Sequence, residues 1–199
     1  MKKRAQDVAA KIIRVASIPP VMVTILIAIL SVYRNDVFAT WQEAAMAVLF
    51  LAILPAMAYP VCAAVPKLKA MGREGQRNTA FIFSFISYLL GWIYGALCHV
   101  GQYSVLIYTI YLFSVLLLLL LNKVFHLRAS GHGCSVTGPI VLIGYFFGIW
   151  GAFAGAAAFL AILWASIRIK RHTVAEFMLG AATCVAAAMA AWALCIGIK

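Results

Sequence analysis

Two short polar segments carry the residue types that could do chemistry in this chain. Residues 129–132 read Ala-Ser-Gly-His and place a hydroxyl, a glycine and an imidazole before an apolar run. Residues 165–176 end in the spacing His172-x-x-x-Glu176. Because residues four apart share one face of a helix, the Glu176 carboxylate can hold one tautomer of the His172 imidazole and stabilise its cation. A histidine oriented in this way is suited to act as a nucleophile.

The residues around both segments are of types that bind phosphate. Arginine makes bidentate contacts with phosphate, and lysine supplies a compact charge. Where an apolar helix starts, a hydroxyl and free backbone N–H groups can point at an anion that the helix dipole favours. The candidate phosphate-binding residues are Lys69, Arg73, Arg77, Arg128, Ser130, Gly131, Arg168 and Arg171. Since these groups can neutralise the phosphate, we expect no metal ion and no cofactor.

Membrane helices must position these residues, because the composition excludes a soluble domain. Of 199 residues, 66% are hydrophobic and 11% are charged, and the mean hydropathy is +1.03. A soluble domain of this length could not bury so much apolar surface. Four of the five cysteines fall in or at the edge of apolar runs, and none forms a C-x-x-C pair, so neither a disulfide nor a cysteine metal site is expected. The sequence therefore predicts an all-α, polytopic membrane protein.

The apolar stretches predict six to seven transmembrane helices. The seven-span division is 17–33, 41–65, 79–99, 103–121, 132–150, 151–167 and 173–198. It requires a tight hairpin at residues 148–151, which read Gly-Ile-Trp-Gly. Without that hairpin, residues 136–167 would form a helix of about 48 Å, which is far longer than a hydrocarbon core of about 30 Å.

Positive charge is distributed unequally between the two sides of the predicted bundle. With seven spans, the N-terminus and the segments 66–78, 122–131 and 166–172 lie on one side. Almost every Lys and Arg lies there, and only Arg34 and Lys199 lie opposite. The positive-inside rule places the rich side in the cytosol. We expect an integral protein of the plasma membrane of a prokaryote, whose first span is retained and not removed as a signal peptide.

In their order and spacing, these segments resemble the type 2 phosphatidic acid phosphatase (PAP2) superfamily, whose members share the patterns K-x6-R-P, P-S-G-H and S-R-x5-H-x3-D. Residues 129–132 are similar to the second pattern with its proline replaced, and residues 165–176 to the third. The interval between the two segments is similar to that of the family, and in this chain one helical hairpin fills it. Residues 69–78 match the first pattern poorly, because Lys69 and Arg77 are one residue too far apart and no proline follows.

The resemblance covers residues 67–180 and implies a metal-independent phosphatase of the membrane. By similarity, His172 attacks phosphorus to give a phosphohistidine, and His132 protonates the departing oxygen and later helps to activate water. The implied substrate is a lipid phosphate or a polyprenyl diphosphate whose tail lies among the spans, and no nucleic acid partner is expected. Residues 1–65 then form a basic segment with two accessory spans, and residues 66–199 form the PAP2-like catalytic core.

Two departures from the family patterns leave a second function open. Ser166 stands where the third pattern carries an arginine, and Glu176 replaces its aspartate. A phosphate cage weakened in this way would bind or move an anionic lipid without cleaving it. Hydrolysis and binding therefore both remain candidate functions, and the oligomeric state is open.

Overall fold

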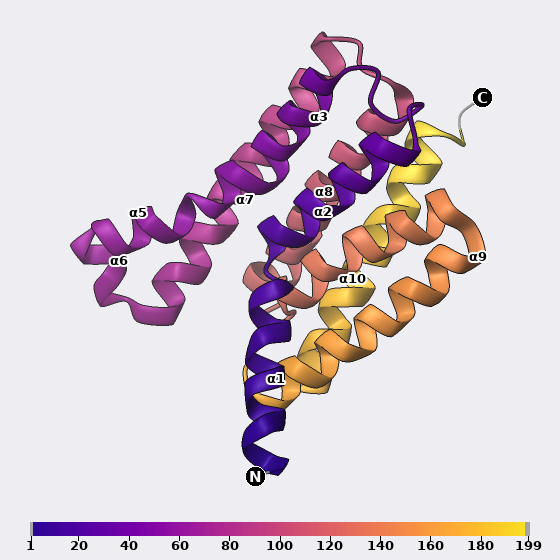
Figure 1. Cartoon of the computed structure of the whole chain (residues 1–199). Helices are drawn as coiled ribbons and strands as arrows, with labels where there is room; N and C mark the ends of the chain where they lie inside the picture. The colour runs from indigo at the N-terminus through magenta and orange to yellow at the C-terminus, as the bar shows by residue number, and fades with distance from the viewer. Residues whose placement is uncertain (1, 198–199) are drawn as a thin grey trace.

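Every regular element is a helix in the part of the chain that the structure, a computed structural model, describes. This part comprises residues 2–197, with the side chains of residues 4–197, and it contains no strand (Figure 1). The elements are α1 (Lys2–Ala16), α2 (Pro19–Tyr33), α3 (Trp41–Val48), the π-helical segment η1 (Leu49–Ile53), α4 (Leu54–Ala56), α5 (Ala58–Ala64), α6 (Pro66–Ala70), α7 (Gly72–Leu97), α8 (Gln102–Leu119), the π-helical segment η2 (Leu120–Val124), α9 (Gly131–Arg168) and α10 (Val174–Cys195). The all-α prediction is confirmed.

Five helical stretches within residues 2–197 are long and apolar enough to cross a membrane. They are Trp41–Ala64, Gly72–Leu97, Gln102–Val124, Gly131–Arg168 and Val174–Cys195. A sixth span arises if α1 and α2, which meet at a bend of 62°, are taken together. This count treats α9 as a single span. The prediction of membrane-helix character is thus confirmed, while the count of six to seven spans stays a prediction.

Helix α9 reverses direction at Gly148, where a hairpin was expected. Gly148 has φ 63° and ψ −144°, a region that glycine enters without a Cβ clash. A Cβ at Gly151 would lie 2.4 Å from the carbonyl oxygen of Ile143. Residues eight apart in a straight helix are separated by about 12 Å, so this approach requires a reversal. The arms 131–147 and 149–168 therefore pack antiparallel, as Figure 1 shows in orange.

The N-terminal basic segment forms helix α1, for which the sequence predicted no element. Ala10 on this helix is fully buried, and Ile13 packs against the buried side chains of Val136, Ile162 and Phe177. These contacts hold α1 against the two arms of α9 and the start of α10. Helix α1 consequently lies beside the residues singled out by the sequence, although it falls within the predicted accessory region.

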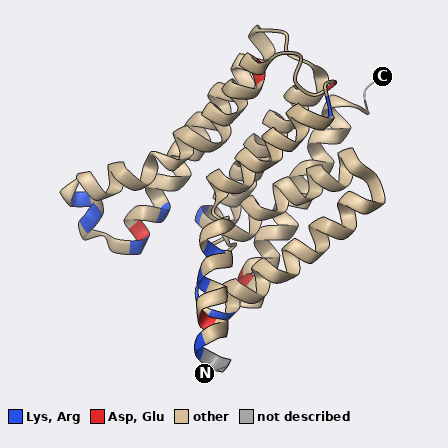
Figure 2. Ribbon diagram, viewed as in Figure 1, with Lys and Arg blue, Asp and Glu red and all other residues tan. Residues whose placement is uncertain are grey.

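Basic residues gather at one end of the bundle, as the sequence predicted. Figure 2 shows blue segments on α1 and around α6 and the start of α7. At the other end, Arg34 forms an ion pair with Asp36 at 2.6 Å and donates to the carbonyl oxygen of Phe146 at 2.6 Å. Lys199 lies outside the described residues.

The starts of α9 and α10 approach each other closely at two glycines. A Cβ at Gly180 would lie 2.1 Å from the carbonyl oxygen of Ser130, and a Cβ at Gly133 would lie 2.5 Å from that of Phe177. The backbone N–H of Ser130 donates to the carbonyl oxygen of Glu176 at 2.9 Å across the same contact. This packing places the segment that ends in His132 next to the segment that begins α10.

Replacing Gly180 with alanine is expected to destabilise the protein by about 1–3 kcal/mol, because the new methyl group meets rigid backbone and the two helices must separate. The measurement is the thermal unfolding midpoint in detergent. Gly131→Ala is the matched control, since a Cβ at Gly131 has nothing within 4 Å. Equal midpoints for the two variants would contradict the close approach.

Candidate functional site

A large cavity lies at the basic end of the bundle, with a volume of about 1480 Å³. Its walls come from α1, α2, η1, α4, α5, α7, α8, η2, α9 and α10 and from the loops at this end. The sequence-predicted site residues that line it are Arg73, Arg77, Arg128, Gly131, His132, Arg171, His172 and Glu176. The structure thus brings two histidines that are 40 positions apart to the walls of one cavity.

Three of the predicted phosphate-binding residues do not line this cavity. Lys69 is exposed on α6. The Ser130 hydroxyl oxygen accepts a hydrogen bond from the Gly133 N–H at 3.1 Å, so it caps the start of α9. The Arg168 guanidinium donates to Asp7 at 2.8 Å and thereby ties α9 to α1. The phosphate contacts predicted for these three residues gain no support from their positions.

The loop that carries His172 is fixed at both ends by helix caps. At the end of α9, Lys170 has φ 54°, and the Arg171 N–H donates to the carbonyl oxygen of Ser166 at 3.2 Å. A residue with positive φ followed by this hydrogen bond is the Schellman arrangement that terminates a helix. At the start of α10, Thr173 is the N-cap. His172 is therefore held between two ordered helix ends, although part of its side chain is exposed.

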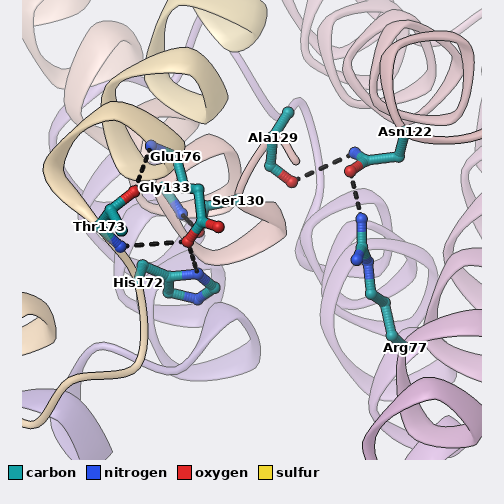
Figure 3. A network of polar contacts seen from close by, with 8 residues as sticks. All are labelled: Arg77, Asn122, Ala129, Ser130, Gly133, His172, Thr173 and Glu176. Atoms are coloured by element: carbon teal, nitrogen blue, oxygen red, sulfur yellow. Dashed lines mark hydrogen bonds and ion pairs between the residues drawn. The ribbon is translucent and has the colours of Figure 1, made fainter. Parts of the chain in front are cut away.

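Glu176 serves both a helix cap and His172. Its carboxylate accepts from the Thr173 N–H at 3.1 Å, while the Thr173 hydroxyl oxygen accepts from the Glu176 N–H at 3.1 Å, which completes a capping box (Figure 3). The same Oε2 lies 3.7 Å from Nδ1 of His172, which is within ion-pair range and longer than a hydrogen bond. The carboxylate thus faces Nδ1 and leaves Nε2 as the nitrogen available for chemistry.

His132 lies deeper than His172, with a relative exposure of 7%. Its Nε2 is 3.5 Å from the Ser17 hydroxyl, and its ring meets the Phe177 ring at 6.1 Å in an edge contact. Its Nδ1 is buried and has no hydrogen-bond partner among the described residues. A buried nitrogen without a partner is costly, so an incoming polar group would be stabilised there.

Asn122, which the sequence reading passed over, links α7 to the segment before His132. Its side-chain amide donates to the carbonyl oxygen of Ala129 at 3.2 Å, and its amide oxygen accepts from Arg77 (Figure 3). Next to it, Lys123 donates to the side chain of Asn78 at 2.7 Å. A polar residue at the end of a long leucine run was the only signal in the sequence. This network holds Arg77, which belongs to the segment that resembles the first family pattern poorly, at the wall of the cavity.

Arg14 of α1 is a further cavity residue that sequence reasoning missed. It lines the wall together with both histidines. Its Nη1 is buried and without a hydrogen-bond partner in the part of the chain that the structure describes. Its charge acts on His172 and on Arg171. The sequence contained no spacing that relates residue 14 to the histidines, because only the packing of α1 creates that relation.

The surroundings of His172 favour its neutral form. Burial lowers the pKa of this imidazole below its ordinary value of 6.5, and the charges of Arg14 and Arg73 lower it further, while Glu176 acts in the opposite direction. A neutral imidazole is the nucleophilic form. At a pH near or below 6.5, a larger fraction of His172 therefore stays in the reactive form than of a free imidazole.

If neutral His172 is the reacting group, the acid limb of the kcat/KM profile is expected below pH 6.5. Arg14→Gln removes one of the charges that lower the pKa of His172, so the acid limb should move to higher pH. The substrate phosphate titrates equally in the experiments with the wild-type protein and with Arg14→Gln. The difference between their two kcat/KM profiles therefore reports on the protein. An acid limb that stays in place or moves to lower pH would contradict this electrostatic assignment.

Taken together, fold and site define an all-helical protein with helices suited to a membrane and a basic cavity that holds two histidines. Within residues 2–197, no group of three or more His, Cys, Asp or Glu side chains is placed to hold a metal ion. Comparison with family models gives no match to this chain, and comparisons with curated proteins and with solved structures give none either. The resemblance to the PAP2 superfamily consequently depends on residues 69–78, 129–132 and 165–176 alone.

Proposed function

We propose that the protein is a membrane-embedded, metal-independent phosphatase that acts on lipid phosphates or polyprenyl diphosphates through a phosphohistidine. The observation that carries this proposal is the cavity at the basic end, whose walls include His132 and His172. Two imidazoles on one cavity can divide the work of nucleophile and general acid.

An excess of cations around the histidines supports an anionic substrate. The arginines in the cavity wall are Arg14, Arg73, Arg77, Arg128 and Arg171. The carboxylates in the wall are those of Glu74 and Glu176. Cations brought together in this excess repel one another unless an anion lies between them. A phosphate or diphosphate headgroup has the charge and the acceptor oxygens to fill this role.

The reaction follows from the roles of the two histidines. In the proposed first step, Nε2 of neutral His172 attacks phosphorus and the bond between phosphorus and the leaving oxygen breaks. This oxygen stays on the lipid alcohol or, for a diphosphate, on the lipid monophosphate. His132, which is protonated in the complex because the anionic phosphate lies beside it, gives its proton to the leaving oxygen. In the second step, His132 takes a proton from water, which attacks the phosphohistidine and releases inorganic phosphate. His172 and His132 then return to their initial protonation states, so the cycle is balanced.

The apolar part of the cavity suits the tail of a lipid. From Asn122 at the basic end, the wall continues along α8 to Leu118, Val115 and Ile110. The step from residue 122 to residue 110 is about 18 Å along a helix at ~1.5 Å per residue. We further propose that the chain crosses the membrane seven times with a PAP2-like core, and that the basic end lies in the cytosol. The charge distribution in Figure 2 supports this orientation.

Binding without turnover is the second candidate function, and Ser166 favours it. This residue is fully buried, and its hydroxyl has no hydrogen-bond partner among the described residues. It therefore contributes no charge to the cavity at the position where the third family pattern carries an arginine. Such a site would recognise or move an anionic lipid.

Release of inorganic phosphate from a panel of lipids tests the proposal. The panel contains diacylglycerol phosphate, a polyprenyl phosphate and a polyprenyl diphosphate, each in mixed micelles with the purified protein. We expect release from at least one lipid, and the same rate with EDTA, because arginines and imidazoles carry out every step. Saturable binding without release would support the second candidate function. A strict requirement for Mg²⁺ would contradict the histidine mechanism.

A further inference from the structure

One polar atom deep in the cavity wall has no role in the proposed phosphate chemistry. Tyr111 on α8 lines the cavity and is 4% exposed. Its hydroxyl is buried and has no hydrogen-bond partner within the described part of the chain. A hydroxyl left unpaired in an apolar setting typically costs about 1–3 kcal/mol. This cost would be offset by a ligand group that accepts the hydrogen bond.

Next to the hydroxyl, helix α9 carries no side chain. Gly138 of α9 also lines the cavity, and a Cβ at this position would lie 3.4 Å from the Tyr111 hydroxyl oxygen and 3.7 Å from the Cys184 sulfur. The absence of a side chain at Gly138 keeps the wall open next to the hydroxyl. One further polar atom lies nearby, since the Ser114 hydroxyl is 3.7 Å from the same sulfur. Polar groups within membrane helices are costly and commonly contact substrate.

The position of the Tyr111 hydroxyl along α9 shows how far it lies from the expected phosphate. Gly138 is six residues after His132 on the same arm of α9, which corresponds to about 9 Å along the helix at ~1.5 Å per residue. With a phosphate between the histidines, the hydroxyl therefore lies below the headgroup and not beside it. In a diacylglycerol phosphate, the ester carbonyl groups stand several bonds below the phosphorus. A polyprenyl chain has only hydrocarbon at that depth.

We propose that the Tyr111 hydroxyl donates a hydrogen bond to the carbonyl oxygen that joins an acyl chain to the glycerol phosphate of the substrate. This inference rests on the proposed function and assigns to the cavity a second polar subsite, which selects ester-linked lipids. Tyr111 does not touch the reacting phosphorus, so it is a specificity-determining residue. Hydrogen bonding to a carbonyl adds affinity only for lipids that carry one.

The test compares dioleoylglycerol phosphate with its dioleyl ether analogue, which has the same headgroup and tails and lacks the carbonyls. We expect the wild-type protein to hydrolyse the ester lipid with about tenfold higher kcat/KM, the factor that corresponds to one neutral hydrogen bond. Tyr111→Phe should lower this ratio to about one. An unchanged thermal unfolding midpoint in detergent would show that the variant is folded.

Tyr108→Phe is the matched control. Tyr108 lies on the same helix, one turn before Tyr111, and packs against Gly91, where a Cβ would come within 2.9 Å of its ring. It is not among the residues that line the cavity. This variant should keep the tenfold preference for the ester lipid.

Each other outcome has a distinct meaning. Equal rates of the wild-type protein on ester and ether lipids, or an ester preference that survives in Tyr111→Phe, would overturn the carbonyl subsite and leave the phosphatase proposal intact. Equal loss of activity on the ester and the ether lipid in Tyr111→Phe, with an unchanged unfolding midpoint, would likewise overturn it. Failure of the wild-type protein to hydrolyse any lipid would overturn the phosphatase proposal; the ester-to-ether ratio would then be measured from dissociation constants, with the same expectation.

Discussion

His172→Asn is expected to reduce phosphate release from a lipid phosphate by about four orders of magnitude or more, because the amide cannot attack phosphorus. Asparagine keeps the approximate size and polarity of histidine, so the caps at Thr173 and Lys170 should be preserved. The measurement is kcat/KM for the lipid that the wild-type protein hydrolyses best. Binding of the same lipid should change little, since the arginines of the cavity remain.

His99→Asn provides the matched control for this variant. His99 is exposed in the turn between α7 and α8, and its φ of 50° is a conformation that asparagine tolerates. It does not line the cavity. Activity within about twofold of the wild-type protein is expected. A comparable loss in both variants would show that folding, and not the nucleophile, had been damaged.

His132→Gln is expected to lower the rate on a lipid phosphate by about 10²–10⁴-fold, the usual contribution of a general acid. The effect should depend on the leaving group. An alkoxide needs a proton as it departs, whereas the phenolate of p-nitrophenyl phosphate does not. For the first step, transfer of the phosphoryl group to His172, the loss of rate with p-nitrophenyl phosphate should therefore be much smaller than the loss with the lipid phosphate. Equal losses with both substrates would assign His132 to binding or to packing against Phe177, and not to proton transfer.

Local sequence patterns were sufficient for several features of the fold. The glycines at positions 148 and 151 predicted the hairpin in α9, because a long apolar run must reverse and glycine accepts the required φ. The spacing of His172 and Glu176 predicted their proximity, since neighbours four apart meet at a helix start. In each case the relevant contact lies within a few turns of one helix. The helical class followed in the same way from apolar run length.

Other features depended on contacts between distant segments, which no local pattern encodes. Arg14 reaches the cavity only because Ile13 packs against α9 and α10. Asn122 joins Arg77 to the segment before His132 through tertiary hydrogen bonds. Conversely, Arg168 was grouped with the phosphate ligands by its position in a motif, and the structure pairs it with Asp7. The cations of the cavity could therefore be assigned only after the helices were placed.

Detection of covalent phosphate on the protein tests the two-histidine mechanism most directly. In His132→Gln, p-nitrophenyl phosphate should still phosphorylate the nucleophile, while hydrolysis of the intermediate is slowed because no general base activates water. After a rapid quench at high pH, where phosphohistidine is stable, mass spectrometry of peptides should find the phosphate on His172. Phosphate on another residue, or none under conditions in which p-nitrophenol is released in a burst, would contradict the mechanism.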